Sequence, residues 1–129
     1  MKAKNIVLFE HYDGVRFVLE RSLLKYHRYV NILSSHWKKE AKIFIDKNDV
    51  DLLITELNSF NSAGLEISRY ARDAEPEIKI IWITVLRCDV FRELKEDLGN
   101  IHCIEKPLEI KYFRRDVIKA LEIESLLDK

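Results

Sequence analysis

The sequence has little of several features that mark common functional classes. Only three glycines, two prolines and two cysteines occur among its 129 residues, and its 22 Lys and Arg residues balance 22 Asp and Glu residues. With no net charge, the chain has no global field that attracts nucleic acid or an anionic membrane, so binding to either would need a local patch. The scattered glycines match neither the P-loop nor the dinucleotide fingerprint, which disfavours nucleotide binding.

Long apolar runs are also missing. No stretch approaches the roughly 20 residues needed to cross a bilayer, and the start of the chain lacks a signal-peptide core. A content of 47% hydrophobic and 34% charged residues fits one globular domain over residues 1–129, which we expect to be cytoplasmic. Cys88 and Cys103 have neither CxxC nor metal-ligand spacing, so in a reducing compartment we expect them to stay thiols.

Short apolar blocks predict five strands, at 6–9, 29–33, 52–54, 80–83 and 101–104. Their continuous apolarity indicates that helices cover both faces of the sheet. The intervening segments carry apolar residues at helical spacing, with Val18 and Trp37 expected in core-facing stripes and Asp13 as a helix cap. The last helix is expected at about 109–127. Five strands alternating with five helices predict an α/β fold with a doubly wound parallel sheet.

In such sheets the binding crevice lies outside the carboxyl ends of the strands. The polar residues that directly follow the predicted strands are therefore the candidate site residues, namely Glu10, His11, Glu56, Thr84 and Lys106.

Four landmarks, in order, resemble the receiver domains of two-component response regulators. They lie at 7–12, 56–66, 81–84 and 105–107, and together they extend the resemblance over nearly the whole chain. The second keeps the frame of the family's phosphoacceptor motif, D-L-x-M-P-x-M-D-G-L-E, but begins with glutamate. The resemblance implies a flavodoxin-like sheet of strand order 2-1-3-4-5.

The resemblance also assigns roles to the candidate site residues. Glu56 stands at the phosphoacceptor position, Glu10 and His11 stand where the family has an acidic pair, and Thr84 and Lys106 match the residues that contact the phosphoryl group. Imidazole is a poor ligand for Mg²⁺, and the extra methylene of glutamate moves its carboxylate into the phosphoryl space. We therefore expect weak or lost Mg²⁺ binding, no other cofactor, no useful phosphorylation and no enzymatic activity.

Two interpretations of Glu56 remain open. In the first, its carboxylate accepts bonds from Lys106 and Thr84 and mimics the phosphorylated state permanently. In the second, Glu56 and Lys106 form only a structural ion pair, worth roughly 0–1 kcal/mol at a wet site.

By analogy with the family, a signalling protein is the expected partner, bound through the last two helices and the fifth strand. The candidate output-face residues are Phe91, Lys95, Cys103, Tyr112 and Arg115. Cys103 stands where the family has an aromatic switch residue, so the usual readout by that ring is lost. We expect no direct nucleic-acid or membrane contact, and a monomer and a homodimer remain equally open. If an output domain follows in the natural protein, the C-terminal part of the last helix would be its signalling helix.

The sequence thus predicts a pseudo-receiver, a protein-interaction module that works without phosphorylation. The main alternative is an active receiver in a phosphorelay, phosphorylated on a non-standard residue. A small enzyme on a flavodoxin-like scaffold is disfavoured because no nucleophile and base pair is evident. A transition-metal site of Glu10, His11 and Glu56 is a further alternative, although no fourth ligand is evident.

Overall fold

The computed structural model describes residues 2–58 and 62–127, so positions 59–61 of the phosphoacceptor-like motif lie outside the described residues. The strands are β1 (Lys4–Phe9), β2 (Val30–Ser35), β3 (Leu52–Glu56), β4 (Lys79–Thr84) and β5 (Ile101–Glu105). The α-helices are α1 (Asp13–Leu23), α2 (Lys38–Lys47), α3 (Ala63–Ala74), α4 (Arg92–Leu98), α5 (Ile110–Leu121) and α6 (Glu124–Leu127). Two short 3-10 helices are η1 (Leu24–Tyr26) and η2 (Cys88–Phe91).

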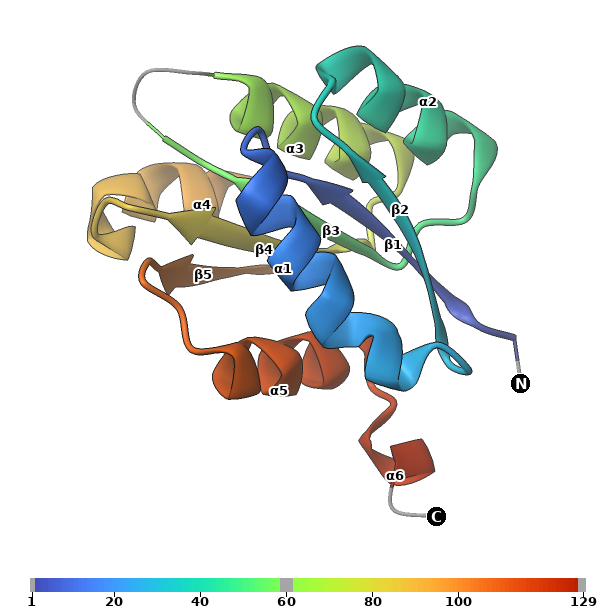
Figure 1. Ribbon diagram of the computed structural model, residues 1–129. Helices are drawn as coiled ribbons and strands as arrows, with labels where there is room; N and C mark the ends of the chain where they lie inside the picture. The colour runs from blue at the N-terminus through green and yellow to red at the C-terminus, as the bar shows by residue number, and fades with distance from the viewer. Residues whose placement is uncertain (1, 59–61, 128–129) are drawn as a thin grey trace.

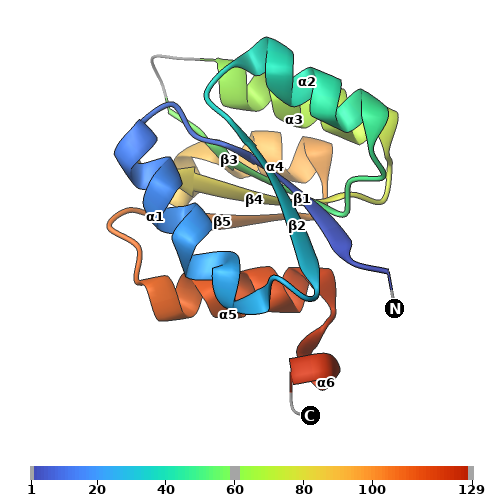
Figure 2. The same cartoon turned by 45° about the vertical axis from the view of Figure 1, so that its right-hand side comes forward.

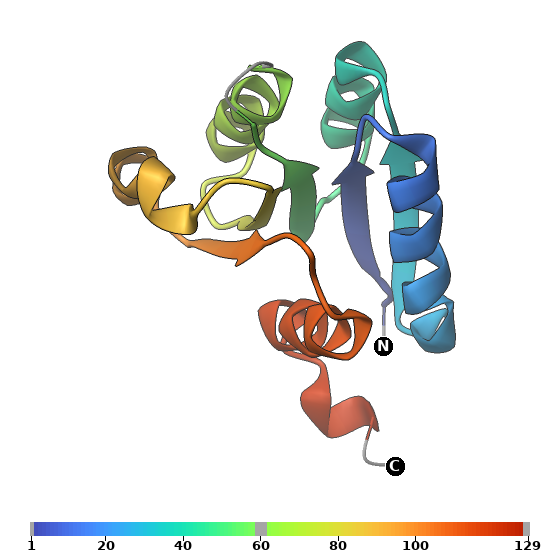
Figure 3. The same cartoon turned by 60° about the vertical axis from the view of Figure 1, so that its left-hand side comes forward.

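All five strands are parallel and lie in the order β2-β1-β3-β4-β5, which confirms the predicted fold class and strand order. Helices α1 and α5 lie on one face of the sheet, and α2 and α3 lie on the other (Figure 1, Figure 2). Figure 3 shows α4 beside β4 and β5, at the far end of the sheet from β2. Each βα unit thus returns the chain to the same end of the sheet.

Alternation along each strand divides the core into two layers. Alternate residues of the central strands, such as Ile54 and Ile81, pack toward α1 and α5, whereas their neighbours Leu53 and Trp82 pack toward α2 and α3. In the central strands both layers are buried, which explains their continuous apolar blocks. The Trp82 indole donates a hydrogen bond of 2.9 Å to the Ser68 hydroxyl, so its polar atom is also satisfied.

Some predicted helix positions were wrong. Val18 is 49% exposed, because the buried stripe of α1 comprises Leu19, Ser22 and Leu23. Trp37 is 62% exposed, because it has an extended backbone and precedes α2 rather than lying on its inner face. Asp13 is the first residue of α1 rather than its cap; its carboxylate pairs with Arg16 at 2.7 Å.

The last helix is also shorter than predicted, and the described residues form six α-helices rather than five. Helix α5 ends at Leu121, after which Glu122 adopts a left-handed conformation with φ of 57°. Residues two apart on a helix point about 200° away from each other, so Leu121 and Ile123 could not both face the core in one continuous helix. The left-handed turn allows both to be buried, and α6 follows as a separate turn of helix. The expectation of a straight helix to residue 127 was therefore wrong.

None of the helices within the described ranges combines the length and the apolar character needed to span a bilayer.

Gly64 is fixed by the close approach of α3 to the end of β3. A Cβ atom at Gly64 would overlap the carbonyl oxygen of Glu56 and lie 3.0 Å from the hydroxyl oxygen of Thr55. We expect Gly64→Ala to lower the free energy of unfolding by about 1–3 kcal/mol, measured by urea denaturation, because backbone atoms of β3 would have to move.

Gly14 supplies the matched control for this substitution. It also lies in a helix, but a Cβ atom there would meet nothing within 4 Å. We expect Gly14→Ala to be neutral or to stabilise the protein by about 0.4–1 kcal/mol, because alanine restricts the unfolded chain. Equal effects of the two substitutions would contradict the proposed close approach.

Candidate functional site

A buried cluster of charged side chains lies at the carboxyl end of the sheet. Glu10 directly follows β1, Glu56 is the last residue of β3, and Lys106 directly follows β5. Phe9 pairs with Thr55, so the next residues of these two strands, Glu10 and Glu56, lie side by side. Backbone bonds extend the sheet past its strands: Glu10 N–H donates to Ser35 and Lys106 N–H donates to Thr84, at 3.2 and 2.7 Å. The parallel register therefore brings together side chains that are far apart in the sequence.

Both carboxylate oxygens of Glu56 accept hydrogen bonds. The Lys106 ammonium donates to Oε2 at 2.8 Å, and the Asn58 side-chain amide donates to Oε1 at 3.0 Å. Glu56 is only 8% exposed, and the side chain of Lys106 is 16% exposed. The pair is thus largely removed from water, where an ion pair is weakened less by solvent and salt than on the surface.

Glu10 is completely buried, and among the described residues neither of its carboxylate oxygens has a hydrogen-bond donor. The nearest cation is the Lys106 ammonium, 3.6 Å from Oε1 and thus beyond good hydrogen-bonding distance. The pKa of Glu10 is raised to about 7, first by burial and then by the neighbouring Glu56 carboxylate, which can accept a hydrogen bond from a protonated Glu10. A proton on Glu10 therefore supplies a hydrogen bond between the two carboxyl groups.

Glu56 and Lys106 favour their charged forms, whereas Glu10 favours its neutral form. Burial opposes ionisation of Glu56, but hydrogen bonds from Glu10 and Lys106 outweigh it and lower the pKa of Glu56. Burial also opposes the charge on Lys106, but the hydrogen bond to Glu56 and the attraction of both carboxylates raise the pKa of Lys106. One ammonium, one carboxylate and one protonated carboxyl make the cluster electrically neutral, the arrangement that costs least in a low-dielectric site.

The other two candidate residues lie differently from the expectation. The Thr84 hydroxyl is fully buried and accepts a hydrogen bond of 3.0 Å from the Leu86 N–H, and no bond from it to Glu56 occurs among the described residues. Thr84 therefore shapes the loop after β4. His11 is exposed, with its ring 5.3 Å from that of Tyr12.

No group of three or more His, Cys, Asp or Glu side chains within residues 2–58 and 62–127 is arranged to hold a metal ion. The two carboxylates that face each other, Glu10 and Glu56, already share the Lys106 ammonium. A divalent cation there would have to displace this ammonium or lie beside it against charge repulsion. The residues present therefore do not fit a Mg²⁺ ion well.

Sequence reasoning missed the roles of Asn58 and Arg16. Asn58 lies two residues after the end of β3, and its polar side chain at the predicted crevice was the available signal. The guanidinium of Arg16 donates to the backbone carbonyl of Glu10 at 2.9 Å and pairs with Asp13, which fixes the turn between β1 and α1. No sequence pattern indicates this backbone contact.

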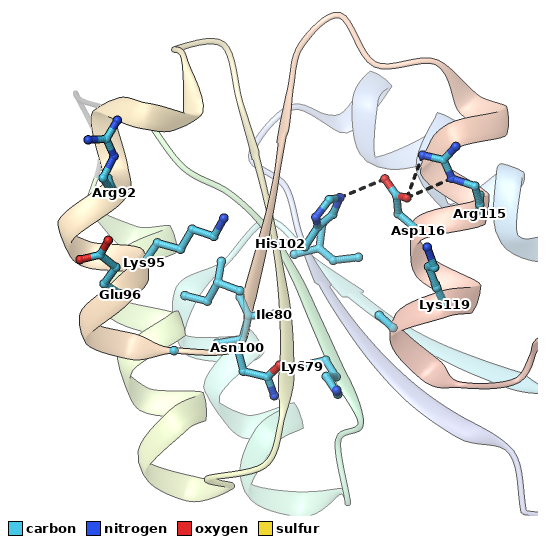
Figure 4. Close-up of a pocket in the computed structure, with 14 residues that line it drawn as sticks. Lys79, Ile80, Arg92, Lys95, Glu96, Asn100, His102, Arg115, Asp116 and Lys119 are labelled. Carbon is cyan, nitrogen blue, oxygen red and sulfur yellow. Dashed lines mark hydrogen bonds and ion pairs between the residues drawn. The ribbon is translucent and has the colours of Figure 1, made fainter.

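The candidate output face contains a basic groove of about 770 Å³ between α4 and α5, floored by β4 and β5 (Figure 4). Five Lys and Arg residues line it against two acids; these are Lys79, Arg92, Lys95, Arg115, Lys119, Glu96 and Asp116. Asp116 already contacts His102 at 3.1 Å and Arg115 at 3.3 Å. The groove is therefore a local positive patch on a chain with no net charge.

The remaining candidate output-face residues fall outside this groove. Tyr112 is 43% exposed and contacts the side chains of Lys111 and Arg115 through its ring. Phe91 is buried, with its ring 6.1 Å from that of Trp82, so it anchors η2 rather than forming surface.

The expectation of free thiols was wrong, because Cys88 and Cys103 form a disulfide. The loop after β4 places Cys88 at the start of η2, beside the middle of β5, where Cys103 lies. Their Cα atoms are 5.9 Å apart, a separation suited to a disulfide. A sequence separation of 15 residues carries no signal for this pairing, which depends on the path of the chain around α4.

Comparisons with known proteins place this geometry in a known fold. No family model and no curated protein matches the sequence. Solved structures do match: a response regulator from Thermotoga maritima has 16% identity and a TM-score of 0.79, over 94% of this chain and 99% of that one. A CheY-like receiver domain protein from Methanospirillum hungatei has 16% identity and a TM-score of 0.81, over 94% and 95%. The receiver domain of the hybrid histidine kinase CckA has 24% identity and a TM-score of 0.70, over 91% and 98%.

The chain therefore has the receiver-domain fold of two-component response regulators.

The pKa of Glu10 generates a test by pH. Between pH 4.5 and about 7, Glu10 binds a proton in the folded state but not in the unfolded state, so its contribution to stability falls as pH rises. Glu10→Gln keeps the shape and supplies an amide donor without the titration. We expect the variant to resemble wild type at pH 5 and to be more stable by about 1–3 kcal/mol at pH 8, measured by urea denaturation.

Glu77→Gln, a substitution of an exposed glutamate remote from the cluster, serves as the control and should have the same small effect at both pH values. A Glu10→Gln variant that loses more stability at pH 8 than at pH 5 would show that ionised Glu10 is favourable in the folded protein.

Proposed function

We propose that this protein is a cytoplasmic pseudo-receiver, a protein-interaction module of a two-component-type signalling pathway that works without phosphorylation and has no enzymatic activity. The observation that carries the proposal is the 2.8 Å bond between the Lys106 ammonium and the Glu56 carboxylate. At the position where the resemblance implies a phosphoacceptor, the chain already contains a negative charge bound to Lys106, the lysine that the resemblance implies at this site. In this receiver-domain fold, the pair lies at the carboxyl end of the parallel sheet.

Phosphoryl transfer at Glu56 faces two obstacles. Its two oxygens accept hydrogen bonds from Lys106 and Asn58, which withdraw charge from the carboxylate and weaken it as a nucleophile. The transferred group also needs cations that neutralise its charge, and Mg²⁺ requires near-octahedral oxygen ligands at about 2.0–2.1 Å. Glu10, which is the remaining acid of the expected pair, favours a proton near neutral pH. We therefore expect Mg²⁺ binding to be weak or lost.

The same contacts favour the interpretation of Glu56 as a permanent mimic of the phosphorylated state. The estimate of 0–1 kcal/mol for a structural ion pair applies to wet sites, whereas Glu56 and Lys106 are largely buried. The mimicry is partial, because Thr84 bonds to the loop after β4 instead of to Glu56. In this proposal, the ion pair holds Lys106 and the start of the β5–α5 connection inward.

The basic groove between α4 and α5 supports the proposed partner surface. Lys95 and Arg115 line opposite walls of the groove, on α4 and α5, as Figure 4 shows. Electrostatic complementarity favours a partner whose docking segment is acidic, and it speeds encounter with such a partner. We infer a signalling protein as the partner and no direct contact with nucleic acid or membrane.

The test of the proposal is intact-protein mass after incubation with Mg²⁺ and acetyl phosphate. We expect wild type to gain no phosphoryl group, because the Glu56 carboxylate accepts hydrogen bonds from Lys106 and Asn58. A Glu56→Asp variant shortens the side chain and opens space for the phosphoryl group, so a phosphoryl group on this variant would show that the rest of the pocket is still competent. The matched control, Glu66→Asp, shortens an exposed glutamate on α3 and should gain none.

A stoichiometric phosphoryl group on wild type would instead favour the alternative of an active receiver in a phosphorelay. Peptide mapping would then identify the non-standard acceptor.

A further inference from the structure

The Cys88–Cys103 disulfide closes a loop that contains η2 and α4 completely. Cys88 begins η2, and Cys103 lies in the middle of β5, so the bond joins the N-terminal end of this helical segment to the edge strand of the sheet. Both cysteines are only partly buried, in contrast to the residues of β3, which are all buried. A small thiol in solution can therefore approach this part of the molecule.

The two ends of the η2–α4 segment are held by different contacts. At the C-terminal end, the Arg72 guanidinium donates to the carbonyl oxygens of Leu98 and Gly99, at 3.1 and 2.6 Å. At the N-terminal end, Phe91 is buried, and the Cys88 N–H donates to the Glu105 carboxylate at 2.8 Å. None of the α4 residues is fully buried. The disulfide thus ties η2 covalently to β5, next to a helix that packs on the core through the partly buried Leu94 and Leu98.

The redox setting gives this bond a role beyond stability. Disulfides in a reducing compartment are usually transient, catalytic or redox-sensing, whereas structural ones belong to oxidising compartments. The proposed function locates this protein in the cytoplasm. A persistent structural disulfide is unexpected there, but a reversible one at the surface of a signalling module is not.

We propose that Cys88–Cys103 is a thiol–disulfide exchange site whose co-reactant is a small thiol or dithiol of the glutathione class. In the forward direction, a reductant thiolate attacks one sulfur, the Cys88–Cys103 bond breaks, and a mixed disulfide forms while the other cysteine leaves as a thiolate. A second reductant thiol resolves the mixed disulfide. The protein gains two electrons and two protons, and two reductant thiols become one disulfide.

Reduction removes the covalent tie between η2 and β5, so that Phe91 and the Cys88–Glu105 hydrogen bond hold the N-terminal end, whereas Arg72 still holds the C-terminal end. Arg92 and Lys95 lie on α4, whereas Arg115 and Lys119 lie on α5, so a shift of α4 changes the separation of the two basic walls of the groove. The redox state then regulates the proposed partner surface. This consequence rests on the proposed function, as does the cytoplasmic setting from which the reversibility of the bond is argued.

The first experiment equilibrates the full chain in buffers of reduced and oxidised glutathione, and then in dithiothreitol, and traps free thiols by alkylation for intact mass. We expect both cysteines to pass from unmodified to alkylated within the range of these buffers and to re-form the disulfide on return to oxidised glutathione. A disulfide that survives the reducing end, or thiols that do not re-form it, would overturn the proposal.

The second experiment measures amide hydrogen exchange of the oxidised and reduced chain. We expect residues 88–98 to exchange at least about tenfold faster after reduction, because without the disulfide this segment can open locally and separate from β5. Helix α3 serves as the internal control and should be unchanged. The double variant Cys88→Ala and Cys103→Val, which fills the site with small apolar side chains, should resemble the reduced chain under both conditions.

Unchanged exchange in residues 88–98 on reduction would overturn the regulatory role, even if the disulfide is reversible. Neither experiment uses a phosphodonor or a partner, so their failure is separate from failure of the proposed function. Conversely, phosphorylation of wild type would overturn the pseudo-receiver proposal and leave the exchange results standing.

Discussion

The ammonium group of Lys106, placed between two buried carboxylates, is the interaction on which the rest of the site depends. It lies 2.8 Å from Glu56 and 3.6 Å from Glu10, at the carboxyl end of the sheet. Two ionised carboxylates with one ammonium would leave an uncompensated negative charge, which is costly away from water. The pKa of about 7 at Glu10 is the response to this constraint, because protonation there restores neutrality and provides a hydrogen-bond donor. The cluster thus uses a lysine and a proton to balance its carboxylates, where a receiver site of the usual type would use a metal ion.

The arrangement depends on the parallel sheet rather than on any local motif. Glu10 and Glu56 are neighbours because β1 and β3 are paired in register, and Lys106 arrives from the far strand through its backbone bond to Thr84. Gly64 allows α3 to approach the carbonyl group of Glu56, which fixes the backbone from which that side chain extends. The core therefore contributes to the site indirectly, because it holds the carboxyl ends of β1, β3 and β5 at the same edge of the sheet.

Strand identity, fold class and strand order could be predicted from the sequence because they rest on continuous apolar blocks and on the order of the landmark motifs. The candidate residues at the strand ends could be named for the same reason, since topology determines where the ends of parallel strands meet. Side-chain partners could not be predicted. The Thr84 hydroxyl turns to the Leu86 N–H, and Asn58 takes the second oxygen of Glu56; both choices depend on loop conformations that residue types do not specify. The end of α5 was missed because the residue that adopts the left-handed conformation there is Glu122, and not a glycine or asparagine that would signal the end of a helix.

The Cys88–Cys103 bond was missed for a related reason. Its formation depends on the path of η2 past the edge strand, which only the folded chain defines. The Cys88–Cys103 bond constrains the connection that leaves β4, and the buried cluster constrains the connection that leaves β5 through Lys106. Cys88 donates its N–H to Glu105, the residue next to Lys106, so the two features are neighbours along the chain as well as in space. The basic groove lies toward the opposite, amino-terminal ends of β4 and β5, where Lys79 and Asn100 line it.

The most direct test of the central claim is an NMR titration of the carboxyl carbons of Glu10 and Glu56, performed with and without Mg²⁺. The account predicts that Glu10 titrates near pH 7, that Glu56 titrates below its ordinary range, and that millimolar Mg²⁺ changes neither curve. The Lys106→Met variant should raise the pKa of Glu56, because it removes the cation that stabilises the ionised form. Two independent titrations in the ordinary glutamate range, or a large shift caused by Mg²⁺, would contradict the claim that Lys106 occupies this site.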